Sequence, residues 1–530
     1  MRQSVPLGFA FWSLHGSVGA GRGLIIVYRA RSGLAMDTQN NTDAGRLFRA
    51  GTVDQLPAEV DDPLFAMASH RPTAAAVITP ERTLNYAGLE RLVASTARRL
   101  RELGCRPGSR IGICLPNGWR LLVLLLAVIR AGGIACPIST RLPLPGVKAL
   151  LRRVAAARFV AVYGDQVDAF QVLTPDDLIR EAHGGERPPA MPVAQPATII
   201  FTSGTTGEPK AALHSIGNHY FSALGSNENI ALETGDRWLL TLPLYHVGGL
   251  GLVFRCILAG ATVVVPEPGR AVAEAVPHYG ATHLSLVAVQ LERLMQAEKK
   301  AVSTALKALL VGGSAVPPAL IRAAGARGYP LYTTYGLTEM TSQVTTTPPG
   351  ASLAQLATSG QCLRYREINA GADGEILVRG AVLFQGYVEA ETLHQPLDPD
   401  GWFHTGDRGD LDDAGYLHVR GRLDNMFISG GENIHPEEIE RVLGTLAGVR
   451  RVVVVPVADP TYGHRPVALV EMHGTVPARA VFEAHLAAQL PRFKIPVAFY
   501  AWPASASSQG MKVDRAFLRR YAEERRKGKS

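Results

Sequence analysis

The sequence predicts an α/β fold, with a large N-terminal region of α/β layers, a small β-rich subdomain and a small α+β C-terminal portion. Strand-like and helix-like segments alternate from Asp62 to about Pro348, which is typical of a mostly parallel layered sheet. Beyond Pro348 the expected strands become short and are separated by turns, which indicates the β-rich subdomain. A last stretch then returns to the alternation of helix and strand.

The first expected element is a helix in which Leu89, Leu92, Val93, Leu100 and Leu103 recur at helical spacing, and Gly104 ends the pattern. Strands 110–115, 133–137 and 159–163 then alternate with helices 119–131 and 144–157. Residues 181–196 are rich in Pro and Gly and are expected to form a linker.

The second half of the alternation begins with a helix around His219. The expected strands that follow are 238–242, 261–266, 282–286 and 308–311, and the short strands of the β-rich subdomain are 374–378, 401–404 and 415–419. The last portion is expected to contain helix 439–446, strand 452–457 and helix 480–490. This order fits two unequal domains, 36–423 and 424–530.

The charge of the 530-residue chain argues against a nucleic-acid protein. The net charge is +8, but residues 1–35 carry four Arg and no acid, and residues 519–530 carry six Lys or Arg against two Glu. The two ends therefore account for the excess. A nucleic-acid partner would require a basic face within the fold.

Cysteine usage and hydropathy indicate a cytoplasmic location. The five cysteines are scattered, without a C-x-x-C pair or a metal-binding spacing, which fits reduced thiols in a cytosol. The longest apolar run, 121–129, is far shorter than the ~20 residues that span a bilayer, so it predicts a buried helix.

Residues 1–35 are expected to be a disordered leader or an over-extended start. Their apolar stretches are interrupted by Arg22 and several glycines, unlike the continuous core of a signal peptide. Met36 begins a polar stretch that is more typical of a true start. The intact mass of protein from the native host tests this expectation, because a mass that includes Met1 to Ala35 would contradict it.

The motif around which the chain is organised follows an apolar run at Ile199, Ile200 and Phe201. Small residues allow backbone N–H groups and hydroxyls to surround phosphate oxygens, and a lysine adds a cation. The residues of this motif are Thr202, Ser203, Gly204, Thr205, Thr206, Gly207 and Lys210. The spacing differs from a Walker A loop, and taken alone the stretch is equally compatible with a plain turn.

Three further motifs carry groups suited to nucleotide chemistry. Tyr335-Gly336-Leu337-Thr338-Glu339 offers a ring, a hydroxyl and a carboxylate that could hold Mg²⁺, although it also fits a turn that opens a helix. Thr405-Gly406-Asp407 places a carboxylate on an expected loop, where it could take two ribose hydroxyls. Gly421–Asn425 is followed by the glycine-containing stretch 428–440.

The order of these blocks over residues 60–520 resembles the adenylate-forming superfamily, which includes acyl-CoA synthetases, luciferases and peptide-synthetase adenylation domains. With 421–425 and 428–440 counted separately there are five blocks; each is modest alone, but five in this order are very specific. The resemblance implies an ATP-dependent ligase with ATP, Mg²⁺ and CoA as cofactor or co-substrates, and a mobile C-terminal domain. It leaves the oligomeric state open.

The resemblance also implies roles for individual residues. Thr202–Gly207 and Lys210 match the phosphate loop, and Gly312, Gly313, Ser314, Tyr335 and Gly336 match positions on the adenine side. Thr338 would meet the α-phosphate, Glu339 the Mg²⁺, Asp407 the ribose and Arg422 its surroundings. Asp424 matches the hinge, Gly430 and Gly431 the loop that meets CoA, and His246 a position lining the acyl pocket. Without its block, His246 would equally fit a core histidine.

The catalytic lysine of the family matches Lys512. The family pattern is Gly-Lys-x-x-Arg, whereas this chain reads Gly510-Met511-Lys512-Val513-Asp514-Arg515. The spacing to Arg515 is kept and the inserted Met511 is a departure. Lys494 is the rival candidate, although it lacks the motif.

The implied reaction has two steps. A carboxylate attacks the α-phosphorus of ATP, giving an acyl-adenylate and pyrophosphate, and Glu339-bound Mg²⁺ and Lys512 would stabilise the growing negative charge. A thiol then attacks the activated carbonyl and AMP leaves. By resemblance, the C-terminal domain rotates at Asp424 between the steps.

Two stretches narrow the expected substrate. Residues 338–345 and 430–436 are similar to those of o-succinylbenzoate–CoA ligases of menaquinone biosynthesis, with Ser342 and Gln343 as the best local cue for an aromatic acid with a second carboxylate. Ser342 and Gln343 would also fit a simple helix start. The alternatives are another acyl- or aryl-CoA synthetase, a luciferase-like oxygenase, or a catalytically silent nucleotide-binding regulatory protein; the presence of Glu339, Asp407 and Lys512 argues against the silent form.

Overall fold

The computed structural model describes residues 47–49, 56–161, 170–180, 187–202, 209–297, 305–314, 316–371, 373–429, 432–460, 462–504, 506 and 513–527. These residues belong to one unit, Asp37–Ser530. The expected leader, 1–35, lies outside the described residues.

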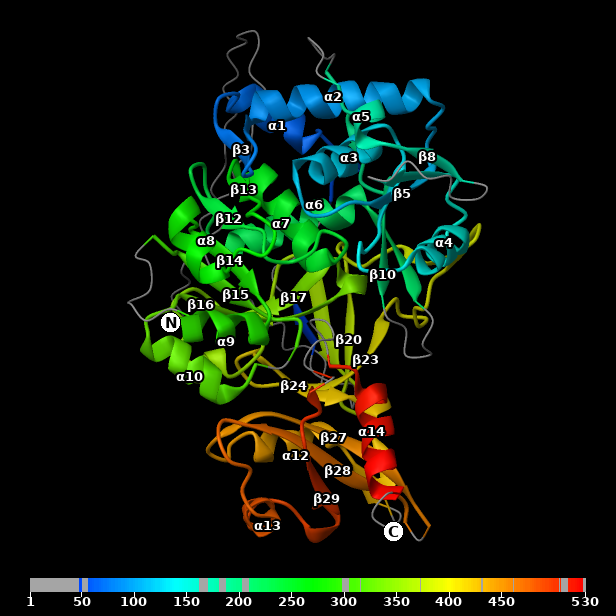
Figure 1. The fold of residues 1–530 in the computed structure, drawn as a ribbon. Coiled ribbons are helices and arrows are strands. Elements are labelled where there is room, and N and C mark those ends of the chain that lie inside the picture. Colours follow the sequence, from blue (N-terminus) through cyan, green and yellow to red (C-terminus); the bar gives the residue numbers. More distant parts are fainter. Residues whose placement is uncertain are drawn as a thin grey trace, which may run out of the picture. The chain divides into compact units, whose positions relative to one another are not determined.

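Two large sheets form the α/β part of the fold (Figure 1). In spatial order the nine-stranded sheet contains β18 (Gln361–Cys362), β17 (Ser342–Thr346), β16 (Leu331–Leu337), β15 (Ala308–Val311), β14 (His283–Leu286), β12 (Arg237–Leu239), β13 (Thr262–Val264), β3 (Ala75–Ile78) and β4 (Thr83–Asn85). The eight-stranded sheet contains β22 (Thr392–His394), β21 (Gly386–Glu389), β11 (Lys210–Ser215), β10 (Pro196–Thr202), β6 (Ile134–Pro137), β5 (Arg110–Cys114), β7 (Arg158–Ala161) and β8 (Gln171–Leu173).

The helices around these sheets fall into groups. The ones that pack between the sheets are α2 (Tyr86–Glu102), α3 (Trp119–Arg130), α6 (Ile216–Asn229) and α7 (Val247–Ala259). Those on the outer faces are α4 (Leu144–Arg153) on the eight-stranded sheet and α8 (Val272–Tyr279), α9 (Ala288–Ala297) and α10 (Pro318–Ala326) on the nine-stranded sheet. The other helices of this part are α1 (Pro63–His70), α5 (Pro175–Leu178) and α11 (Leu353–Leu356).

Alternation along the strands explains why both faces of the nine-stranded sheet are covered. Trp238 and Val263 face the helices between the sheets, whereas their neighbours Leu239 and Val264 face α8–α10. Successive strand side chains point to opposite faces, so a strand that is apolar at every position must be buried on both sides. This is the α/β architecture that the sequence predicts.

A third, antiparallel sheet forms the expected β-rich subdomain. Its strands are β1 (Leu47–Arg49), β19 (Arg366–Ala370), β20 (Glu375–Gly380), β23 (Phe403–Leu411) and β24 (Leu417–Arg422). Its core includes Ile368, Val378 and Phe403, which cluster with Phe221 of α6 and Val344 of β17. In the segment expected to be a linker, β9 (Met191–Pro192) pairs with β2 (Glu59–Val60).

The C-terminal portion has a sheet of its own. It comprises β26 (Glu432–Ile434), β25 (Phe427–Ser429), β28 (Gly463–Met472), β27 (Val449–Asp459) and β29 (Ala498–Ala501). Helices α12 (Pro436–Leu443) and α13 (Arg479–Ala487) cover one face, and α14 (Arg515–Lys527) covers the other. A large α/β part and a smaller α+β part are therefore present, as predicted.

One local expectation and one of the alternatives are wrong. Asp407 lies within strand β23 rather than on a loop, because residues 403–411 pair with both β20 and β24. Ser342 and Gln343 begin strand β17 rather than a helix. The element that precedes them is a single 3₁₀ turn, η1 (Thr338–Met340). Within the described part of the chain, every helix falls short of the length and apolar character needed to cross a bilayer.

A buried ion network joins the first helices of the large part. Arg130 of α3 contacts Asp62 at 2.7 Å and Glu90 at 2.6 Å, and the Arg130 and Asp62 side chains are each only 6% exposed. Asp62 also accepts hydrogen bonds from the backbone N–H groups of Leu64 and Phe65 and so caps α1.

We expect Arg130→Met to lower the free energy of unfolding of the large part by about 3–5 kcal/mol, because it leaves two buried carboxylates without their cation. Denaturant unfolding followed by tryptophan fluorescence measures this loss. Arg187→Met is the control, because the Arg187–Asp61 pair is 71% and 66% exposed and such pairs contribute at most about 1 kcal/mol. Equal effects from both variants would contradict the prediction.

Candidate active site

One cleft brings together side chains from the motifs that lie within the described residues. Its lining includes Thr202, Lys210, His246, Gly312, Gly313, Ser314, Tyr335, Gly336, Thr338, Glu339, Ser342, Gln343, Asp407, Arg422 and Asp424. Ser203–Gly207, Gly430, Gly431 and Lys512 lie outside the described residues. Thr202 and Lys210 are paired across β10 and β11, so both ends of the phosphate-loop motif open into the same cleft as Glu339 and Asp407.

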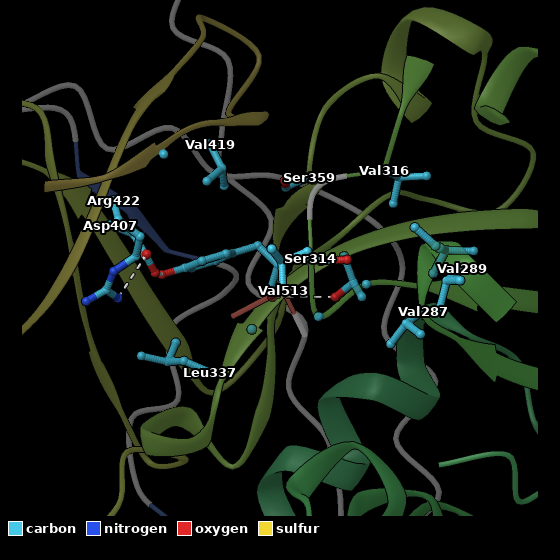
Figure 2. Close-up of a pocket in the computed structure, with 18 of the residues that line it drawn as sticks. Val287, Val289, Ser314, Val316, Leu337, Ser359, Asp407, Val419, Arg422 and Val513 are labelled. Atoms are coloured by element: carbon cyan, nitrogen blue, oxygen red, sulfur yellow. Dashed lines mark hydrogen bonds and ion pairs between the residues drawn. The ribbon is translucent and has the colours of Figure 1, made fainter. Parts of the chain in front are cut away.

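Strand register positions the carboxylate expected to bind ribose. Asp407 of β23 and Arg422 of β24 are partners in the antiparallel ladder, and Arg422 Nη1 lies 3.1 Å from Asp407 Oδ1. The hydroxyl of Tyr335 donates to Asp407 Oδ2 over 2.6 Å. Figure 2 shows Asp407 and Arg422 joined on one side of the cleft, with Ser314, Val287 and Val289 on the other.

Burial dominates the protonation of this group. It raises the pKa of Asp407 from its ordinary value, although Tyr335 and Arg422 favour the ionised form. Burial, and next the nearby Asp407 charge, raise the pKa of Tyr335 well above its ordinary value, so Tyr335 remains a hydrogen-bond donor. The carboxylate of Asp407 is thus held in place from two sides before a ligand arrives.

A tight hairpin between β16 and β17 forms the wall that carries Tyr335, Glu339 and Ser342. A Cβ added at Gly336 would lie 1.9 Å from the carbonyl oxygen of Ser342, so only glycine permits this approach of the two strands. Thr341 and Ser342 have φ of 55° and 131°, a conformation that non-glycine residues adopt at an energetic cost. The chain therefore reverses within five residues.

Glu339 fits the expected Mg²⁺ position. It is half-buried at the cleft wall, its carboxylate accepts a hydrogen bond from the Tyr387 hydroxyl over 2.5 Å, and the Thr338 hydroxyl is adjacent in sequence. Among the described residues, no group of three His, Cys, Asp or Glu side chains is placed to hold a metal. A single carboxylate suits Mg²⁺, which is usually held by one or two carboxylates together with substrate phosphates and water.

His246 lies exposed at the start of α7, and its ring contacts the Tyr245 ring at 4.7 Å between centroids. The alternative of a core histidine is therefore wrong. Gln343 is buried and donates from Nε2 to Thr346 Oγ1 over 2.8 Å, whereas no protein partner is found for its Oε1 in the described structure.

Sequence reasoning missed Arg255, a buried arginine in the same wall. Arg255 lies on α7, is 1% exposed, and donates from Nη2 to the Ser342 hydroxyl over 3.1 Å. Its Nε has no hydrogen-bond partner and its guanidinium forms no ion pair among the described residues, and the guanidinium lies over the Trp238 ring, 5.5 Å from the centroid. Burial lowers its pKa to about 10, which leaves it cationic at neutral pH. An arginine inside the otherwise apolar run 247–261 was the available signal.

Two other groups have clear structural roles. Lys494, the rival for the catalytic lysine, forms a 2.6 Å ion pair with Glu438 and is 16% exposed. His214 is fully buried on β11 and contacts the Thr338 carbonyl through Nε2 over 2.8 Å, which supports the backbone beside Glu339.

The matches to known proteins agree with this geometry. The model of the AMP-binding enzyme family matches residues 64–388, and that of the AMP-binding enzyme C-terminal domain matches residues 438–508. The chain belongs to the AMP-binding enzyme family. The two matched regions include every motif in the described cleft except Asp407, Arg422 and Asp424, which lie between them.

Several known proteins are similar to this chain over most of its length. A 2-succinylbenzoate–CoA ligase of Bacillus cytotoxicus is 32% identical, covering 87% of this chain and 98% of the relative. The structure of a variant of E. coli MenE with bound OSB-AMS is 31% identical with a TM-score of 0.77, covering 88% and 98% of the two chains. Bacillus subtilis o-succinylbenzoate CoA synthetase with ATP and magnesium is 30% identical with a TM-score of 0.76, covering 84% and 96%.

We expect His214 to make stability depend on pH. Burial lowers the pKa of His214 to about 4, so the unfolded chain binds a proton near pH 6.5, before the folded chain does. Stability is therefore lost as pH falls from about 6.5 to 4, and His214→Gln should reduce that loss by up to about 3 kcal/mol. Denaturant unfolding at a series of pH values measures it.

His404→Gln is the control of opposite sign. The hydrogen bond from His404 to Glu375 raises the pKa of His404, so its contribution is present at low pH and is lost as pH rises through the folded-state pKa. An unchanged loss of stability at low pH in His214→Gln would contradict the assignment.

Proposed function

We propose that this protein is an AMP-forming acid–CoA ligase that activates o-succinylbenzoate as an acyl-adenylate and transfers it to CoA, a step of menaquinone biosynthesis. Membership of the AMP-binding enzyme family and the names of the similar proteins support this reaction. None of the five cysteines forms a disulfide in the described structure, which supports the expected cytoplasmic location.

The buried cation of Arg255 is the observation that carries the substrate proposal. An arginine that is 1% exposed and lacks an ion pair among the described residues is costly unless a ligand supplies the anion. It lies at the wall of the cleft, beside Ser342. o-Succinylbenzoate has two carboxylates, so one can be activated while the other pairs with Arg255. A monocarboxylate such as a fatty acid offers no such anion.

In the first step, a substrate carboxylate oxygen attacks the α-phosphorus, and pyrophosphate leaves with the electron pair of the broken P–O bond. Asp407, fixed by Tyr335 and Arg422, would orient the ribose, and Lys210 would face the phosphates. Glu339 would hold Mg²⁺, which supplies positive charge next to the phosphate oxygens when bound, and the neighbouring Thr338 hydroxyl would meet the α-phosphate. Positioning and electrostatics provide most of the rate enhancement in such transfers.

In the second step, the thiolate of CoA attacks the acyl carbonyl and AMP departs as the leaving group. We propose that the two steps use different arrangements of two domains, 36–423 and 424–530. Asp424 lies in the 3₁₀ turn η2 (Leu423–Asn425) between β24 and β25, and its ion pair with Arg422 is 2.9 Å long. A short exposed turn can absorb the backbone rotation of a hinge, which would exchange Lys512 for the Gly430–Gly431 loop at the cleft.

Pyrophosphate release with a panel of acids tests the proposed function. We expect release with o-succinylbenzoate and much less with benzoate or fatty acids, and CoA should convert the adenylate to a thioester. Preference for a monocarboxylate would favour another acyl- or aryl-CoA synthetase. The absence of turnover with any acid would favour a silent nucleotide-binding protein.

We expect Arg255→Met to raise the KM for o-succinylbenzoate by about 100-fold, because it removes one partner of a buried charge pair. The KM for ATP should change little. Arg255→Lys, which keeps a cation, should lose less. Since no protein carboxylate depends on Arg255 in the described structure, thermal unfolding should show a folded Met variant. An unchanged KM for o-succinylbenzoate would contradict the role.

We expect Lys512→Ala to abolish adenylate formation but to spare thioester formation from supplied o-succinylbenzoyl-adenylate, because the proposed domain rotation places Lys512 at the phosphates only in the first step. Lys494→Ala is the matched control, since its ammonium is paired with Glu438. Rapid-quench assays of the two half-reactions separate the outcomes. Equal loss of both half-reactions in Lys512→Ala, or the expected pattern in Lys494→Ala instead, would contradict the assignment.

A further inference from the structure

Tyr387 lies between two groups that serve the phosphates. Its hydroxyl donates to Glu339 Oε1 over 2.5 Å, and the ammonium of Lys210 lies over its ring, 4.9 Å from the centroid. The three residues come from different segments of the chain and all line the cleft. Tyr387 is therefore the contact through which a candidate Mg²⁺ ligand and the phosphate-loop lysine are connected.

Strand register explains this position. Tyr387 of β21 is paired with Ala212 of β11, and Lys210 is two residues from Ala212 on the same strand. Residues two apart share a face of a sheet, and diagonal neighbours are within reach of long and aromatic side chains. Tyr387 and Lys210 thus meet on one face as a consequence of the pairing.

Neighbouring contacts hold the Tyr387 ring in place. The Phe384 ring packs edge-on against it, with 4.8 Å between centroids, and the Phe384 backbone N–H donates to the Glu339 carbonyl over 2.7 Å. Gly386, with φ of 138°, allows the chain to pass the His394 carbonyl, where an added Cβ would lie 2.5 Å away. The phenol approaches Glu339 from a rigid support.

The contact between Tyr387 and Glu339 has one direction, because the phenol hydroxyl carries the proton and Glu339 Oε1 accepts the hydrogen bond. A hydrogen bond to a charged acceptor is stronger than a neutral one and limits rotation of the carboxylate.

We infer that Tyr387 is a positioning residue for Mg²⁺·ATP, because its hydroxyl fixes the Glu339 carboxylate toward the metal while its ring holds the Lys210 ammonium toward the phosphates. This inference rests on the proposed function only in that the protein binds ATP with Mg²⁺. It does not depend on which acid is activated. The hydroxyl and the ring of Tyr387 have separate roles, and substitutions that remove one or both can distinguish them.

Isothermal titration calorimetry of the full chain with ATP, in Mg²⁺ or in EDTA and without any acid, tests the inference. We expect Tyr387→Phe to weaken Mg²⁺·ATP binding by about tenfold, the effect of losing a hydrogen bond to a charged group. Binding of metal-free ATP should change by less than about twofold, since the ring remains over Lys210. Tyr387→Leu should weaken both.

Activity supplies a second readout. In Tyr387→Phe, the Mg²⁺ concentration that gives half-maximal pyrophosphate release should rise by about tenfold, a larger change than that in kcat at saturating Mg²⁺. Tyr416→Phe is the matched control, because it also removes a buried tyrosine hydroxyl, which contacts Gln355 at 2.5 Å outside the cleft. Tyr416→Phe should change neither the half-maximal Mg²⁺ concentration nor kcat.

A double-mutant cycle decides the outcome even if Tyr387→Phe is less stable. In a Glu339→Gln background, Tyr387→Phe should cause little further loss of Mg²⁺·ATP affinity, because the contact has already been altered. Equal losses with and without Mg²⁺, or fully additive losses in the cycle, would overturn the inference. Failure of the acid panel with normal Mg²⁺·ATP binding would instead count against the proposed substrate alone.

Discussion

The close approach of strands β16 and β17 is the constraint on which the candidate site depends. Because Gly336 has no side chain, the Ser342 carbonyl can lie where a Cβ would otherwise be. The hairpin then reverses through Thr341 and Ser342 in a conformation that non-glycine residues seldom adopt. As a result, one short segment holds three side chains that each hydrogen-bond to a distant residue. Tyr335 contacts Asp407, Glu339 contacts Tyr387, and Ser342 contacts Arg255. The proposed nucleotide side and the proposed acyl side of the cleft share this backbone, so a change at the hairpin should affect both.

Two buried arginines behind the hairpin, Arg366 and Arg255, differ in how their guanidinium groups are hydrogen-bonded. Arg366 is 2% exposed, and its guanidinium donates to the carbonyls of Gln343, Arg364 and Ser222. Its hydrogen-bonding capacity is used to fix the backbone behind Ser342. Arg255 makes one hydrogen bond, to a hydroxyl, and leaves its Nε without a partner in the described structure. The first arginine is explained by the fold alone, whereas the second has only the Trp238 ring and one hydroxyl beside its guanidinium, and we propose that a substrate anion completes its environment.

The sequence predicted the layered part of the fold well because the physical signal was local. Apolar strands such as 308–311 and the helix ended by Gly104 follow directly from periodicity and from glycine. Asp407 was misplaced on a loop because the strands of the third sheet are short, antiparallel and rich in Gly and Asp, so they lack a clear alternating pattern. The alternative of a helix start at Ser342 stayed open for a related reason, since the strained reversal before it has no compositional signature.

The site was predictable where a motif held the chemistry, and not where long-range packing created it. Tyr335, Glu339 and Asp407 could be selected by residue type and order, but the bonds that fix them depend on strand register. Arg255 and Tyr387 were missed because each acquires its role only when a distant strand is placed against it: Ser342 is 87 residues from Arg255, and Glu339 is 48 residues from Tyr387. A lone arginine in an apolar helix was the one local sign of a buried charge.

The central claim is that this cleft activates a diacid whose second carboxylate meets a buried cation. The most direct measurement is the affinity of the protein for two unreactive analogues of o-succinylbenzoyl-adenylate, one with a free second carboxylate and one with that group as a methyl ester. The account predicts that the free acid binds about 100-fold more tightly and that this preference disappears in Arg255→Met. Equal affinity of the unmodified protein for the two analogues would contradict it.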